Sequence, residues 1–136
     1  MPEDKDAPDV QAETSAGPVP MPTEVQVGAV TFRVTRDAQE WLEVEHATQT
    51  SGYYGHCKPS QGMIYLNPEN PEDVTRLSLW HEVLHALTAT TMGATEFRGL
   101  GKKQVEREET LIRLWEHPTL AVLRDNPALV AYLTAS

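Results

Sequence analysis

The segment that most constrains this chain is residues 71–92, where apolar residues recur with the three-four spacing of a long helix. It begins with a proline and two acidic residues, which are favoured in a first helical turn. Well inside it, residues 81–85 read H-E-V-L-H. Side chains four positions apart lie about 40° apart around a helix axis. We therefore expect His81 and His85 to project from one face of this helix.

The pattern H-E-x-x-H combines two metal ligands with an acid. Two histidines at this spacing hold a zinc ion, and the glutamate between them acts on the bound water. Glu82 lies about 100° round the helix from His81, beside the expected ion. The alternative is an ordinary helix that carries two half-buried histidines with no metal. The neighbouring sequence favours the first interpretation, a zinc-dependent hydrolase.

Catalytic zinc usually takes three protein ligands and keeps one position for water, so a third ligand is required. In the extended pattern H-E-x-x-H-x-x-G-x-x-H, the positions of Thr88 and Thr91 would be Gly and His, so that class is excluded. The other histidines stand at no recognisable offset from the motif: His46, His56 and His117. A glutamate is therefore favoured as the third ligand.

Three glutamates, Glu106, Glu108 and Glu109, lie near the start of the next predicted helix, residues 104–117. On a helical wheel, Glu108 lies about 25° from the centre of the apolar stripe, Glu109 about 125° and Glu106 about 175°. An unpaired carboxylate within an apolar stripe would be costly, and a divalent cation would remove that cost. We predict Glu108 as the third ligand and keep Glu109 as the alternative. If neither binds metal, Glu108 is a solvated helix charge.

The remaining patterns predict short strands and helices, and so an α+β fold. The expected elements are a β-hairpin over 23–35, a helix over 38–49 capped by Asp37, a second hairpin over 53–66, an end to the Glu-bearing helix at Pro118, and two short helical pieces at 119–125 and 127–134. Residues 93–102, with three glycines, are expected to form a loop.

Composition sets the domain organisation and excludes some partners. Residues 1–22 are rich in proline and acidic residues, which predicts a disordered tail before one folded domain, 23–136. The net charge of −9, without a basic stripe, argues against direct nucleic-acid binding. We expect no membrane span and no secretory signal. The single cysteine, Cys57, fits a reducing compartment, so a cytoplasmic protein is expected.

Over residues 24–134 the chain resembles the small zincin-like metallopeptidases of phages and prophages, with the later glutamate of a gluzincin. The corresponding pieces read, in order, GYYGHCKPSQGMIYLN, HEVLHAL, EETLIRLW and RDNPALVAYL. The resemblance implies a minimal zincin-like domain, in which a small antiparallel sheet or hairpins pack on the H-E-x-x-H helix and a second Glu-bearing helix. It also implies Zn²⁺ as cofactor and a peptide or protein substrate, in the bacterial host cytoplasm if the chain is phage-encoded.

A site of this kind would hydrolyse peptide bonds with Glu82 as the general base on zinc-bound water. In zincins the strand before the motif helix commonly receives the substrate, so we expect residues 63–67 to be the substrate edge. Tyr53, Tyr54 and His56 are candidate oxyanion stabilisers. The alternative is that both tyrosines are core or hairpin residues and His56 is a surface residue.

Two other functions stay open. The same domain could be a zinc-stabilised, non-catalytic module that binds a protein partner in phage assembly or host takeover. It could also be a peptidase that inactivates a repressor, although the E-x-x-A-N-x-F-A helix pattern of such peptidases is absent. The sequence predicts neither the substrate sequence nor the oligomeric state.

Overall fold

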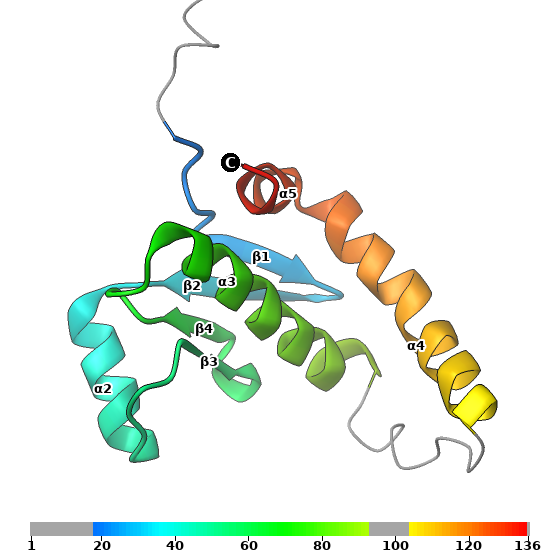
Figure 1. The fold of residues 1–136 in the computed structure, drawn as a ribbon, viewed down its shortest axis with the longest axis horizontal. Helices are drawn as coiled ribbons and strands as arrows, with labels where there is room; N and C mark the ends of the chain where they lie inside the picture. The colour runs from blue at the N-terminus through cyan, green and yellow to red at the C-terminus, as the bar shows by residue number, and fades with distance from the viewer. Residues whose placement is uncertain (1–17, 93–103, 136) are drawn as a thin grey trace, which may run out of the picture.

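The computed structural model describes residues 18–92 and 104–135, but not the side chains of 91–92, 104–109 and 112. Over the described residues the chain forms an α+β fold, as expected (Figure 1). Its strands are β1 (Glu24–Val27), β2 (Val30–Thr35), β3 (Gly55–Lys58) and β4 (Met63–Leu66), and its α-helices are α2 (Ala38–Thr48), α3 (Glu72–Leu87), α4 (Gln104–Asp125) and α5 (Pro127–Leu133). No helix among the described residues is long and apolar enough to cross a membrane.

The four strands form one mixed sheet in the order β1-β2-β4-β3. Both expected hairpins are present, because β1 pairs antiparallel with β2 and β3 with β4. The two hairpins meet through β2 and β4, which run parallel, with Arg33 opposite Met63. The sheet is therefore mixed: its two hairpins are antiparallel as expected, but the pairing between them is parallel. The physical reason is that α2 and the loop after it return the chain to the end of the sheet where β2 stops, and β3 then runs back along the sheet, so that β4 runs in the same direction as β2.

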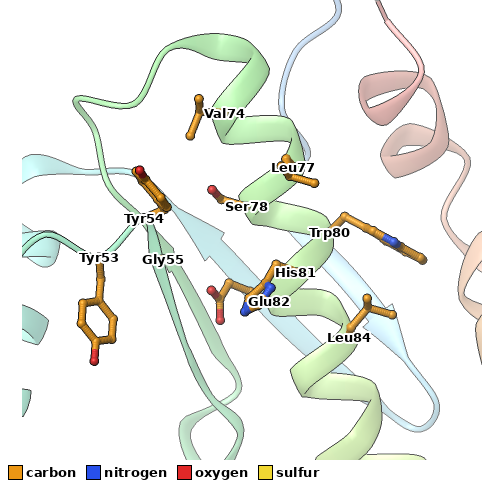
Figure 2. Close-up of a pocket in the computed structure, with 10 residues that line it drawn as sticks. All are labelled: Tyr53, Tyr54, Gly55, Val74, Leu77, Ser78, Trp80, His81, Glu82 and Leu84. Carbon is orange, nitrogen blue, oxygen red and sulfur yellow. The ribbon is translucent and has the colours of Figure 1, made fainter.

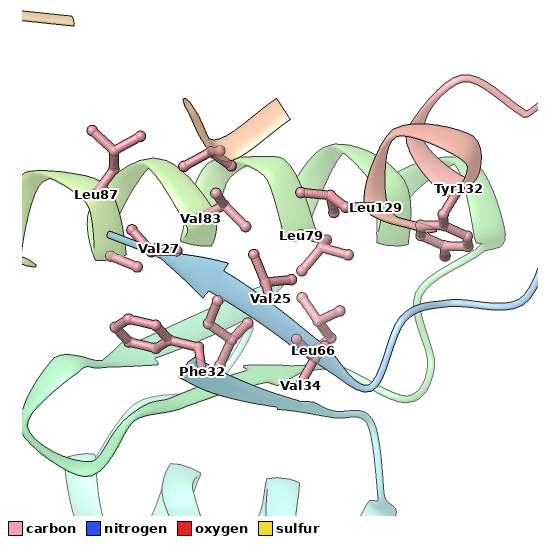
Figure 3. Close-up of a cluster of buried hydrophobic side chains, with 13 residues drawn as sticks. Val25, Val27, Phe32, Val34, Leu66, Leu79, Val83, Leu87, Leu129 and Tyr132 are labelled. Atoms are coloured by element: carbon pink, nitrogen blue, oxygen red, sulfur yellow. The ribbon is translucent and has the colours of Figure 1, made fainter. Parts of the chain in front are cut away.

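The hydrophobic core lies between the sheet and α3, and α5 closes one end of it (Figure 3). Alternation along the strands points their apolar residues toward this layer, as the sequence predicts for the first hairpin. The largest fully buried side chains of the core are Tyr132, Phe32, Ile64, Leu66, Leu79, Leu87 and Leu129. Met21 also packs against the core, whereas residues 1–17 of the predicted tail lie outside the described residues.

Helix α2 lies across the opposite face of the sheet (Figure 3). Asp37 caps its first turn as expected, since its carboxylate accepts a hydrogen bond from the Glu40 backbone at 3.0 Å. Trp41 anchors the helix, because its ring lies 5.2 Å from the ring of His56 on β3. Alternate residues of a strand face opposite sides of a sheet. His56 therefore faces α2, and its neighbours Gly55 and Cys57 face α3.

Helix α3 begins at Glu72, as predicted, and the chain stays helical to Met92 through a five-residue π-helix, Thr88–Met92. One apolar residue of this helix, Leu77, is 70% exposed. The buried positions are Thr75, Ser78, Leu79, Glu82, Val83, Ala86 and Leu87. The core therefore lies along Leu79 and Val83, while Leu77 is left at the surface and Trp80 and Leu84 are half-buried.

Helix α4 continues through Pro118 and ends at Asp125, so the predicted stop at Pro118 is wrong. Proline removes one helical hydrogen bond, which normally bends or ends a helix. Here the Thr119 hydroxyl donates to the Trp115 carbonyl in the same turn. Trp115 before the proline and Val122 after it both pack on the core, which keeps the helix continuous. The piece expected at 119–125 is thus the end of α4.

Asn126 separates α4 from α5 and ties both to the sheet. Its side-chain Oδ1 accepts from the Gln26 backbone N–H at 2.8 Å, and its Nδ2 donates to the Gln26 carbonyl at 2.8 Å. The same Nδ2 donates to the Val122 carbonyl at 2.7 Å. Asn126 therefore pairs with the backbone of β1 at the sheet edge, as a further strand would. Helix α5 begins at the next residue, Pro127, as expected.

Candidate metal centre

The two histidines of the motif point at each other from consecutive turns of α3. The Nε2 atoms of His81 and His85 lie 3.2 Å apart. Their ring centroids are 4.8 Å apart, and the ring planes meet at 73°. The sequence expectation that both imidazoles share one face of the helix is therefore met in the structure.

This nitrogen separation fits one shared metal ion. Zinc binds histidine nitrogens at about 2.0–2.1 Å with tetrahedral geometry, so two such nitrogens lie about 3.3 Å apart. The observed Nε2 separation is 3.2 Å. Burial, together with the charge of His81, lowers the pKa of His85 below its ordinary value of 6.5. The neutral ring that results is the form that binds a metal.

Glu82 lies beside this pair on the buried side of α3 and is only 6% exposed. It packs so closely on β3 that a Cβ at Gly55 would lie 3.0 Å from Oε2 of Glu82. Burial raises the pKa of the Glu82 carboxyl to about 7. A carboxyl that binds a proton near neutral pH is suited to general acid and base chemistry.

The predicted third ligand falls outside what the structure describes. Glu108 belongs to α4, but its side chain, like those of Glu106 and Glu109, lies outside the described residues. Among the described side chains, no three His, Cys, Asp or Glu residues form a set that could hold a metal ion. Helix α4 does contact the π-helix that follows α3. Glu108 therefore stays a prediction.

His56 lies on the other face of the sheet from the motif. Its Nε2 atom is 3.2 Å from the Thr50 hydroxyl, and its ring stacks on Tyr53 with centroids 5.2 Å apart. Burial and the charge of Lys58 lower the pKa of His56. These contacts assign His56 a packing role between Tyr53 and α2, and they do not support its role as an oxyanion stabiliser.

Tyr53 and Tyr54 precede β3 at the surface beside α3 (Figure 2). Neither belongs to the core, since Tyr53 is 52% and Tyr54 64% exposed. Both line an apolar cavity of about 690 Å³ that also reaches His81 and Glu82. This segment is therefore within reach of a molecule bound in front of the motif, although the Tyr53 ring itself stacks on His56.

The expected substrate edge, residues 63–67, is not an edge. Strand β4 is hydrogen-bonded to β2 on one side and to β3 on the other, so it has no free backbone groups for an added strand. Strand β3 is the edge nearest to α3, and the opposite edge strand, β1, is paired to Asn126 at Gln26. The reason is the pairing order: the second strand of this hairpin, β4, pairs with β2, which leaves its first strand, β3, at the edge.

The backbone of β3 has groups that point away from the sheet. The Tyr54 carbonyl accepts from the Asn67 N–H at 3.0 Å, which marks these two residues as a hydrogen-bonded pair. Such pairs alternate along an antiparallel ladder. The next pair, Gly55 with Leu66, is therefore not hydrogen-bonded, and the N–H and C=O groups of Gly55 point outward. Two residues later, the N–H and C=O groups of Cys57 point outward for the same reason.

Gly55 and the apolar cavity are the features of the candidate site that sequence reasoning missed. The signal for Gly55 was an isolated glycine at the start of a strand, which often marks a close approach of another group. The signal for the cavity was weaker, because it depends on which face of α3 is buried.

Comparison of the chain with protein-family models, with curated proteins and with solved structures finds no match.

Proposed function

We propose that this protein is a zinc-dependent peptidase with a minimal zincin-like domain. The observation that carries the proposal is the His81–His85 pair, whose Nε2 atoms lie 3.2 Å apart beside the buried carboxyl of Glu82. In the proposal His81, His85 and Glu108 hold the metal and Glu82 is the catalytic base. The predicted Glu108 supplies the negatively charged ligand that completes a His-His-Glu set.

When bound, a zinc ion would lower the pKa of its water toward about 7 and polarise the carbonyl of the substrate. Glu82 would accept a proton at its carboxylate from the water that attacks the peptide carbonyl. The protonated carboxyl would then give this proton to the amine nitrogen as the C–N bond breaks. Burial of Glu82, which raises its pKa to about 7, lets the same group both accept and release a proton near neutral pH.

The substrate in this proposal binds as an extended strand along β3 rather than along β4. The outward backbone groups of Gly55 and Cys57 can pair with a peptide, as in other cases of strand addition to an exposed edge. Both residues line a second cavity, of about 430 Å³, together with His81, Glu82 and His85. A peptide on β3 would thus pass directly in front of the two histidines.

Substitution of the proposed base tests this function. Glu82→Gln keeps the shape of the side chain but cannot accept the proton, so cleavage should fall by at least about 10²-fold while zinc stays bound. Glu43→Gln, an exposed glutamate on α2, is the matched control and should cleave as the wild type does. The substrate probe is a tryptic digest of a bacterial lysate, in which mass spectrometry detects new peptide termini.

The competing function is a zinc-stabilised domain that binds a protein partner without cleaving it. Under that function neither the wild type nor Glu82→Gln would generate new termini, although both would bind zinc. Equal cleavage by the wild type and Glu82→Gln would also contradict the proposal, because it would remove Glu82 from the chemistry.

A further inference from the structure

The cavity of about 690 Å³ in front of α3 has an apolar wall of a kind that proteins seldom leave exposed (Figure 2). Its volume lies within the range of about 300–1,000 Å³ that is typical of ligand pockets. The residues that line it are Tyr53, Tyr54, Gly55, Val74, Leu77, Ser78, Trp80, His81, Glu82 and Leu84. Most of these side chains are aliphatic or aromatic.

The outer wall comes from the surface stripe of α3. Leu77 is 70% exposed, and Trp80 and Leu84 follow it at helical spacing on the same side of α3 (Figure 2). Tyr54, 64% exposed, faces this stripe across the cavity from the segment before β3. Exposed apolar groups that line a hollow beside a reactive group mark a binding site for an apolar ligand.

Part of the cavity wall belongs to the proposed catalytic site. His81 and Glu82 line this cavity and also the second one, which lies along β3. They are the only lining residues of the apolar cavity, among those described, whose side chains carry charge or titrate near neutral pH. A charged substrate side chain placed against the apolar part of this cavity would find no oppositely charged partner there, and burial of an unpaired charge is costly.

We infer that this cavity binds the bulky apolar side chain of the substrate residue that flanks the cleaved bond. The inference rests on the proposed function and adds the substrate class to it: peptides with leucine, phenylalanine or a similar residue beside that bond. The peptide backbone lies along β3, and its apolar side chain enters the space between Tyr54 and Leu77. Preference for such peptides then comes from the area of Leu77 and its neighbours that the side chain covers.

The test compares leucine hydroxamate with glycine hydroxamate by isothermal titration calorimetry on the zinc-loaded full chain. Both compounds carry the same metal-binding group and differ only in the isobutyl side chain. The wild type should bind the leucine compound at least about tenfold more tightly, as expected for burial of one leucine side chain. Leu77→Asp should reduce this preference below about threefold, because it places a charge in the apolar wall.

Leu42→Asp is the matched control, since Leu42 is a similarly exposed leucine on α2, across the sheet from the cavity. It should keep the full preference. Equal affinity of the wild type for both hydroxamates would overturn the inference but not the peptidase, because glycine hydroxamate would still bind. An unchanged preference in Leu77→Asp would also overturn it. If neither compound binds the zinc-loaded chain, the proposed function itself fails, and the inference with it.

Discussion

The backbone of β3 at Gly55 lies so close to the side chain of Glu82 that an added methyl group would displace this side chain by a few tenths of an ångström. A Cβ at Gly55 would lie 3.0 Å from Oε2 of Glu82 and 3.1 Å from its Cγ. The backbone carbonyl of Tyr65 would be 3.1 Å away on the neighbouring strand. That carbonyl is fixed in the sheet, so the Glu82 side chain has to move. Gly55 therefore positions the proposed base.

Gly55→Ala should lower peptide cleavage by about 10- to 100-fold while zinc content stays at the wild-type level, because a small displacement of a catalytic group is enough to slow a reaction that much. Cleavage rate and bound zinc are measured on the same samples. Gly52→Ala is the control, since Gly52 has a φ of +77° and open space around it. It should cost about 1 kcal/mol of stability and leave the rate unchanged. Full activity in Gly55→Ala would contradict the positioning role.

Asn126→Ala should lower the free energy of unfolding by about 2–3 kcal/mol. The substitution leaves the backbone N–H and carbonyl of Gln26 without their partner at the edge of the sheet, where Asn126 is nearly buried. Urea denaturation measures the effect. Asn70→Ala, which removes one side-chain hydrogen bond to the Tyr54 carbonyl, should cost less than about 1 kcal/mol. A loss at Asn126 no larger than that at Asn70 would show that the tie to β1 contributes little.

Tyr132→Phe should reveal a pH-dependent stabilisation of the start of α3. The Tyr132 hydroxyl donates to Glu72, and this hydrogen bond lowers the pKa of Glu72 below its ordinary value of 4.5. A lowered carboxyl pKa adds stability that is complete above the ordinary pKa and is lost as the pH falls through the lowered value. We expect a loss of about 1 kcal/mol at pH 7, and a smaller loss at pH 3.

Urea denaturation in EDTA at both pH values measures this difference without a contribution from bound metal. Tyr65→Phe is the matched control, because the Tyr65 hydroxyl makes only a 3.4 Å hydrogen bond to Gln61. Its effect should be small at both pH values. A Tyr132→Phe loss of the same size at pH 3 and pH 7 would contradict the link to Glu72.

The local elements of this fold follow from the sequence, and the long-range arrangement does not. Asp37 and the alternation in residues 23–35 specify a helix cap and a hairpin through neighbours in the chain. The parallel pairing of β2 with β4 joins residues about thirty positions apart, for which the sequence carries no local signal. The continuation of α4 through Pro118 was missed for a related reason, since packing of Trp115 and Val122 on the core outweighs the local preference of proline.

The candidate site also has features that the sequence predicts and features that only the long-range arrangement determines. The spacing of His81 and His85 predicted their common face, because a helix repeats every 3.6 residues. The burial of Glu82 and the exposure of Leu77 depend on which side of α3 meets the sheet, and the spacing of the apolar residues alone does not specify that side. An edge strand in front of the motif was expected, but which strand forms that edge is decided by the order of pairing in the sheet.

The most direct measurement is elemental analysis of bound zinc in the purified chain and its histidine variants. The wild type should hold about one zinc ion per chain, and His81→Ala and His85→Ala should hold almost none. His117→Ala should match the wild type, because the His117 side chain is 89% exposed and contacts only the adjacent Glu116 among the described residues. Loss of zinc in Glu108→Ala would support the third ligand. A wild type that holds no zinc after reconstitution, or a His85→Ala variant that keeps a full ion, would contradict the account.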